Sequence, residues 1–115
     1  DSQILVQTPE FKPAREGQTV ELRCRVENSK VSDMDLVWEK LGRTHKATNL
    51  LIYYRNHDIH RYTSDARFQA TRDDFSNSFT LTISNLKLTD FAVYYCFVFR
   101  TNIRGTGTEL SVARK

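Results

Sequence analysis

The sequence predicts an all-β fold in which two antiparallel sheets face each other and one intersheet disulfide joins them. Three observations lead to this prediction: two cysteines enclose more than half of the chain, a tryptophan lies between them, and short alternating segments are separated by polar turns. Cys24 and Cys96 permit only one intrachain pairing. The alternative is two free thiols in a cytosolic protein, but Trp38 and Tyr94 favour the bridge and an extracellular location.

Length and composition place this fold in a single domain that spans residues 1–115. A chain of 115 residues with 39% hydrophobic and 27% charged residues can form one core and remain soluble. Its longest apolar run falls far short of the ~18 residues of a membrane helix, so we expect no membrane contact by this domain itself. The net charge of +3 is spread along the chain, which argues against a nucleic-acid partner.

Four segments have the pattern of strands. They are residues 19–26, 36–39, 79–83 and 92–96. In the first of them every second residue from Val20 to Val26 is apolar, so these side chains share one face of a strand. Turn signals occur at Gly17, at Gly42 and in residues 73–77. A helix-like stretch at residues 86–91 precedes the last pair of strands.

The spacing of the core residues indicates which kind of sandwich this is. A Cys…Trp…Cys order, with a tyrosine two residues before the second cysteine, is typical of an immunoglobulin sandwich. Trp38 is expected to fill the core beside the bridge, and the Tyr94 hydroxyl to bind backbone at a corner between strands. The long interval between Trp38 and Cys96 leaves room for two additional edge strands, beginning at residues 50–54. The sequence therefore predicts a V-set immunoglobulin sandwich.

Several segments resemble a kappa-type light-chain variable domain, and together they cover nearly the whole chain. They are Leu50-Leu51-Ile52-Tyr53, Arg67-Phe68, residues 79–86 and residues 90–96. In that family the arginine that matches Arg67 pairs with the aspartate that matches Asp90 at the bottom of the sandwich. The resemblance thus implies a structural ion pair between Arg67 and Asp90.

The end of the chain is similar to more than one kind of immune protein. Residues 105–112 resemble a joining-segment strand, and also the last strand of germline V-set receptors such as the signal-regulatory proteins. An arginine four positions past the cysteine, as in Phe99-Arg100, is similar to the pattern of those receptors. T-cell co-receptor chains and other leukocyte V-set receptors are similar at this level too.

Departures from the antigen-receptor pattern lie on the surface where a light chain meets a heavy chain. Arg104 stands where those domains carry an aromatic residue before Gly-x-Gly. Glu39 and Leu41 stand where they carry a pairing tyrosine or valine and a pairing glutamine. The third loop, residues 97–103, is short for a recombined antigen site. We therefore expect a germline receptor, and the alternative is an antigen-receptor variable domain, light-chain or T-cell-receptor-like, with an unconventional pairing surface.

Strand alternation predicts an exposed apolar face that could hold a partner or a second copy of the chain. The expected face comprises Val37, Glu39, Leu41, Leu50, Tyr53, Tyr95, Phe97 and Arg104. Phe99 is expected to extend it, unless Phe97 and Phe99 fold back over the third loop instead. Glu39 and Arg104 are expected to pair, either within the domain or across a two-fold homodimer. A heterodimer through the same face is the other possibility.

Three loops form a second candidate surface for a protein ligand or antigen. The loops are residues 28–35, 54–62 and 97–103. Their aromatic, arginine and amide side chains match those of antibody binding loops, and the candidate residues are Tyr54, Arg55, His57, Tyr62, Phe99, Arg100 and Asn102. The arginines would suit an acidic partner, whereas ordinary solvated loop residues are the alternative interpretation.

Chemistry other than binding finds no support in the sequence. No cysteine is free to join His57 and His60 and nothing brings His45 to them, so we expect no metal site. No nucleophile–base arrangement is apparent, and no helix follows Gly105-x-Gly107 to form a phosphate loop. We expect no catalytic residue and no cofactor. The expected function is extracellular recognition by an immune-type cell-surface receptor, with a homophilic adhesion module as a third class.

Overall fold

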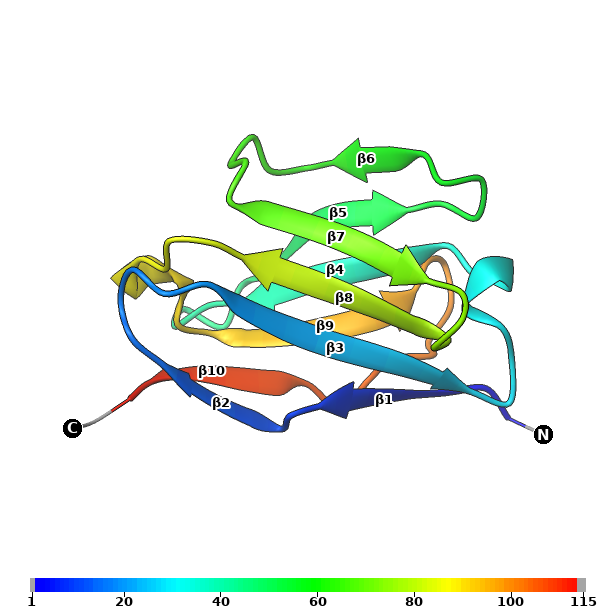
Figure 1. The fold of residues 1–115 in the computed structure, drawn as a ribbon, viewed down its shortest axis with the longest axis horizontal. Helices are drawn as coiled ribbons and strands as arrows, with labels where there is room; N and C mark the ends of the chain where they lie inside the picture. The colour runs from blue at the N-terminus through cyan, green and yellow to red at the C-terminus, as the bar shows by residue number, and fades with distance from the viewer. Residues whose placement is uncertain (1, 114–115) are drawn as a thin grey trace.

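The computed structural model describes residues 2–113 and contains two β-sheets packed face to face (Figure 1). One sheet has four strands, in the order β1 (Ile4–Thr8), β3 (Val20–Glu27), β8 (Ser78–Ile83) and β7 (Phe68–Asp73). The other has six, in the order β2 (Phe11–Ala14), β10 (Thr108–Val112), β9 (Val93–Val98), β4 (Leu36–Leu41), β5 (Ala47–Tyr53) and β6 (Ile59–Arg61). Strands β2 and β10 are parallel, and the other neighbours are antiparallel.

The core between the sheets follows from the alternation seen in the sequence. In β3 every second side chain from Val20 to Val26 is buried, and the side chains between them are exposed. Glu27, at the end of the strand, is half-buried. Cys24 of β3 is bonded to Cys96 of β9, so the disulfide joins the two sheets, as predicted. Trp38 of β4 lies beside Cys96 in register and is fully buried, with its ring 5.5 Å from that of Phe79. The predicted V-set sandwich is confirmed.

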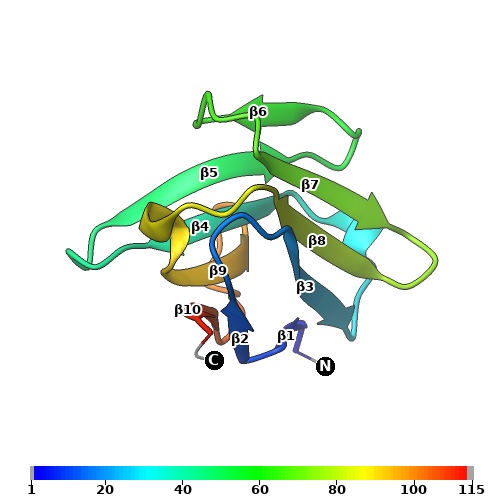
Figure 2. The same ribbon diagram turned by 60° about the vertical axis from the view of Figure 1, so that its left-hand side comes forward.

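The two additional edge strands of a variable-type domain are present as β5 and β6, and Figure 2 shows β6 at one edge of the molecule, far from β1 and β2. Strand β5 begins at Ala47, three residues before the expected start. The second edge strand was expected without bounds, and β1, β2 and β7 were not predicted. Strands β1, β2 and β6, of three to five residues, are too short to show a clear alternation.

Two 3-10 helices complete the described elements, η1 (Val31–Asp33) and η2 (Leu88–Asp90). The second lies within the helix-like stretch expected at residues 86–91. The Tyr94 hydroxyl donates a hydrogen bond of 2.6 Å to the backbone carbonyl of Asp90, which fixes the corner between η2 and β9. Burial, and then the nearby Asp90 charge, raise the pKa of Tyr94, so this hydroxyl stays protonated and continues to donate.

At the same end Arg67 forms a two-pronged ion pair with Asp90. Nη1 lies 2.6 Å from Oδ2 and Nη2 lies 3.0 Å from Oδ1, and Asp65 binds the same guanidinium from the other side at 2.8 Å. Burial alone would raise the pKa of Asp90, but the hydrogen bonds from Arg67 and from the Lys87 amide outweigh it and the pKa lies below its ordinary value. The pair implied by the light-chain resemblance is present.

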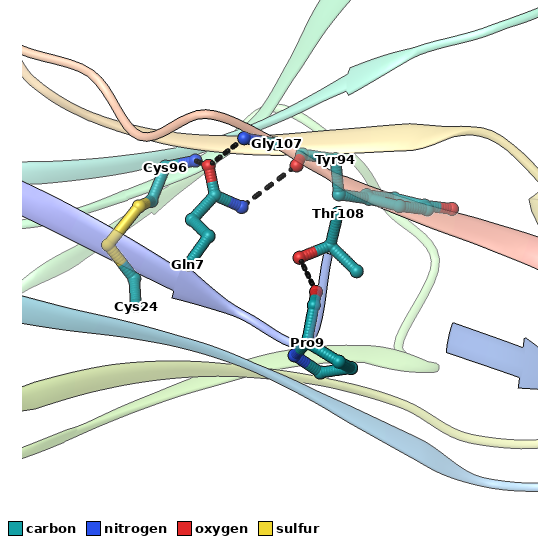
Figure 3. The surroundings of a disulfide bond; sticks show 7 residues. All are labelled: Gln7, Pro9, Cys24, Tyr94, Cys96, Gly107 and Thr108. Carbon is teal, nitrogen blue, oxygen red and sulfur yellow. Dashed lines mark hydrogen bonds between the residues drawn. A yellow bond between two sulfur atoms is a disulfide. The ribbon is translucent and has the colours of Figure 1, made fainter. Parts of the chain in front are cut away.

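Gln7 is a structural residue that the sequence did not reveal (Figure 3). Its amide donates to the Tyr94 carbonyl at 2.9 Å, and its carbonyl oxygen accepts from the backbone amides of Gly107 and Cys96 at 2.9 and 3.3 Å. A Cβ at position 105 would collide with the Gln7 side chain. Gly105, the first glycine of Gly-x-Gly, therefore leaves the space that Gln7 occupies. Gln7 therefore holds β1 against β9 and the start of β10.

Candidate functional site

The outer face of the six-stranded sheet is organised around Arg104. Its Nη2 lies 2.7 Å from Oε1 of Glu39, across the sheet within the same domain. Its guanidinium also lies 4.9 Å from the ring centroid of Tyr95 and 5.3 Å from that of Phe97. Arg104 thus covers two aromatic rings with its planar cation and pairs with the Glu39 carboxylate.

Three residues expected on this face are buried instead. Leu50 has no partner on β4, because the register shifts between Trp38 and Glu39, and this β-bulge turns Leu50 into the core. Tyr53 also joins the core, with its ring edge-on to Phe79 at 5.8 Å. Val37 is fully covered, although it lies outside the core cluster.

The remaining outer-face residues offer less apolar surface than expected. Glu39, Leu41, Tyr95 and Phe97 are half-buried, and only Arg104 is exposed. None of the large hydrophobic side chains that are exposed within residues 2–113 belongs to this set. The face therefore presents an arginine over partly covered aromatic rings rather than an open apolar patch.

The three candidate loops meet at Asp35. Its backbone carbonyl accepts a hydrogen bond from the Phe99 amide of the third loop at 2.8 Å. Its side-chain Oδ1 accepts from the Arg55 amide of the second loop, also at 2.8 Å. The rings of Tyr54 and Phe99 contact each other edge-to-face, with centroids 6.3 Å apart. One residue of the first loop thus fixes the positions of the second and third.

Most of the candidate loop residues lie at this end of the sandwich, which is called the loop end below. Arg55, His57, Arg100 and Asn102 are exposed there, while Tyr54 and Phe99 are half-buried. The Arg100 guanidinium lies 5.1 Å above the Phe99 ring. Tyr62 does not join this group, because β6 carries the chain away from the loop end and Tyr62 lines a hollow beside Arg67 and Asp90.

Arg72 of β7 binds the second loop from the opposite sheet, and no pattern in the sequence predicted this contact. Its side chain donates to the backbone carbonyl of Arg55 at 3.1 Å and to Nε2 of His57 at 2.9 Å. An arginine N–H can only donate, so Nε2 of His57 accepts and Nδ1, 2.9 Å from the Tyr53 hydroxyl, carries the proton of the neutral ring. His57 is thus a fixed part of the second loop.

Within residues 2–113 no three His, Cys, Asp or Glu side chains are grouped as a metal ion would require. In that part of the chain no helix has the length and apolar character to cross a membrane. What the geometry does provide is a rigid loop end and a sheet face covered by a charged side chain.

The fold, the bridge and the Tyr94 corner define an immunoglobulin sandwich of the variable type. Residues 7–113 match the immunoglobulin V-set domain family, and the chain belongs to this family. V-set domains are typically extracellular or secreted and generally non-enzymatic. The family match and the relatives below support an immunoglobulin-type recognition domain.

Relatives of this chain include proteins of the immune system. It is 33% identical over 114 residues to the Ig kappa chain V region S211 of Rattus norvegicus, covering 96% of this chain and 97% of the relative. It is 34% identical over 110 residues to the Ig kappa chain V region K-25 of Oryctolagus cuniculus, covering 94% and 95%. It is 35% identical over 86 residues to Pre-B lymphocyte protein 3 of Homo sapiens, covering 71% and 69%.

Proposed function

We propose that this chain is the extracellular recognition domain of an immune-type cell-surface receptor and that it binds a protein ligand through the loop end. The observation that carries the proposal is the junction at Asp35, which holds backbone amides of Arg55 and Phe99 at 2.8 Å. Loops that are already fixed lose less conformational entropy when they bind. A rigid surface of this kind suits recognition better than a set of independently mobile loops does.

The side chains at the loop end support the same function. Tyr54 and Phe99 are aromatic groups with few rotatable bonds, and Arg100 and Asn102 beside them can form hydrogen bonds. Aromatic and arginine residues supply most of the binding energy in many protein interfaces. Arg55 and Arg100 are both exposed, so an acidic region of the ligand is the complementary surface.

The second candidate function is an antigen-receptor variable domain with an unconventional pairing surface. The kappa V-region relatives, which are matched over nearly their full length, favour it. Arg104 argues against it, because a domain that packed on Tyr95 and Phe97 would displace the guanidinium and break its ion pair with Glu39. The germline receptor therefore remains the first proposal.

The test is a binding screen of the multimerised domain against an array of recombinant leukocyte ectodomains. Two loop variants, Arg100→Glu and Tyr54→Ala, are compared with matched changes away from the loop end, Arg43→Glu and Tyr62→Ala. We expect each loop variant to lose at least about tenfold in affinity for the array protein bound by wild type, while both control variants bind within about twofold. Equal losses in loop and control variants, or no loss in either, would overturn the proposal.

A further inference from the structure

The turn between β7 and β8 carries a phenylalanine that is wholly in water. Phe75 is 99% exposed, the highest value among the exposed large hydrophobic residues of the described chain. Single apolar residues on a surface are common, but most of them keep part of the side chain against the protein. Phe75 has almost no contact of that kind.

The backbone beneath Phe75 is held in one conformation by Asp73. Oδ1 of Asp73 accepts from the Phe75 amide at 3.0 Å and from the Ser76 amide at 3.4 Å. Oδ2 accepts from the Ser76 hydroxyl at 2.9 Å. The phenyl ring is therefore presented from a fixed turn, and little backbone entropy remains to be lost when a partner binds.

This turn is joined to the loop end on both sides. Asn77 donates to the backbone carbonyls of Val26 and Ser29 and accepts from the Val31 amide at 2.7 Å, which connects the turn to the first loop. Arg72, which precedes the turn, binds the second loop through the Arg55 carbonyl. Figure 1 shows the β7–β8 turn at the same end of the sandwich as η1 and the β5–β6 connection.

We propose that Phe75 is an anchor residue of a fourth recognition segment, and that its ring enters an apolar pocket on the protein ligand of the loop end. This inference rests on the proposed function. Buried aromatic anchors dominate many protein interfaces, and they pair with pockets on the partner. Asn77 and Arg72 join this turn to the first and second loops, so a protein that binds the loop end is the partner within reach of the ring.

The test extends the ectodomain array to Phe75→Ser and Phe75→Leu, with Tyr62→Ser as the matched change of an exposed aromatic outside the loop end. Every array protein that loses binding to Arg100→Glu is expected to lose at least about tenfold with Phe75→Ser. Phe75→Leu should retain part of the affinity, and Tyr62→Ser should bind within about twofold of wild type. The unfolding midpoint of Phe75→Ser should equal that of wild type, since the side chain touches almost nothing in the domain.

The possible outcomes separate the two proposals. If Arg100→Glu loses binding and Phe75→Ser does not, the anchor role is wrong and the loop-end function stands. If neither variant loses binding, both are wrong. A second copy of the chain is the other conceivable occupant, and sedimentation velocity detects it: association of wild type that disappears in Phe75→Ser would assign the ring to a homodimer and overturn the ligand anchor.

Discussion

Arg104 and Glu39 form an ion pair across the outer sheet face, with 2.7 Å between Nη2 and Oε1. The arginine side chain is 45% exposed and the glutamate 13%, so the pair contributes little to stability by itself. Its effect is steric and electrostatic, because the guanidinium lies over Tyr95 and Phe97 and keeps a charge on top of them. The outer sheet face is thus covered by a side chain of the domain itself.

Arg104 should therefore keep the domain monomeric. We expect wild type to sediment as a monomer over a wide concentration range, and Arg104→Ala to self-associate as concentration rises because Tyr95 and Phe97 become accessible. Arg55→Ala removes the same charge at the loop end and should remain monomeric. If the sedimentation coefficient of wild type rises with concentration, or if Arg104→Ala stays monomeric at every concentration, Arg104 does not prevent self-association through this face.

Loss of Arg67 should destabilise the domain strongly. The Asp90 side chain is 2% exposed and Arg67 16%, so Arg67→Met leaves a buried carboxylate without its cation. Breaking such a pair costs about 3–5 kcal/mol in the free energy of unfolding, whereas Arg25→Met at the exposed Arg25–Glu27 pair should cost under about 1 kcal/mol. Urea denaturation measures both values. Similar costs for the two variants would mean that burial of the Arg67–Asp90 pair has no special effect.

The same pair gives stability a definite dependence on pH. The pKa of Asp90 is lowered below its ordinary 3.8 by Arg67 and the Lys87 amide, which outweigh burial, and hydrogen bonds from Arg67 lower the pKa of Asp65. Below about pH 4 the unfolded chain binds more protons than the folded one, so this stabilisation is complete above that pH and is lost as pH falls through the folded pKa. The unfolding free energy of wild type should thus decline more steeply below about pH 4 than that of Asp90→Asn, and parallel curves would contradict this assignment.

Removal of the Asp35 carboxylate should loosen one loop and leave its neighbour fixed. Asp35→Ala deletes the acceptor for the Arg55 amide but keeps the backbone carbonyl that binds the Phe99 amide. A hydrogen bond to a charged group is worth about 1.5–3 kcal/mol, so hydrogen exchange at the Arg55 amide should accelerate at least about tenfold. Exchange at Phe99 in the same sample serves as the control. Equal acceleration at both amides would mean that the whole loop end has opened.

Much of the fold was predictable because its main signals are local in the sequence. The alternation through Cys24, the order of Cys24, Trp38 and Cys96, and the tyrosine two residues before Cys96 each follow from covalent spacing and strand geometry. The bulge at Leu50 was not predictable, since one unpaired residue reverses the inside–outside alternation of everything that follows in the strand. Regular alternation would place Leu50 and Tyr53, three positions apart, on opposite faces of the sheet, whereas with the bulge at Leu50 both lie in the core.

Contacts between segments far apart in the chain were also not predictable from the sequence. Gln7 binds Tyr94 and Gly107, and Arg72 of β7 binds His57 in the loop between β5 and β6. Neither contact has a signature in the segments that it joins. For Glu39 and Arg104 the residue types suggested a pair but left the intradomain and two-fold arrangements open. The structure has the contact within one domain.

Two charge reversals measured together show whether recognition uses the loop end or the outer sheet face. The measurement is binding of Arg100→Glu and Arg104→Glu to the ectodomain array, with circular dichroism to verify that both variants are folded. If the loop end binds the ligand, we expect at least about tenfold weaker binding for Arg100→Glu and binding within about twofold of wild type for Arg104→Glu. Loss of binding in Arg104→Glu with full retention in Arg100→Glu would contradict this expectation and assign the ligand to the sheet face.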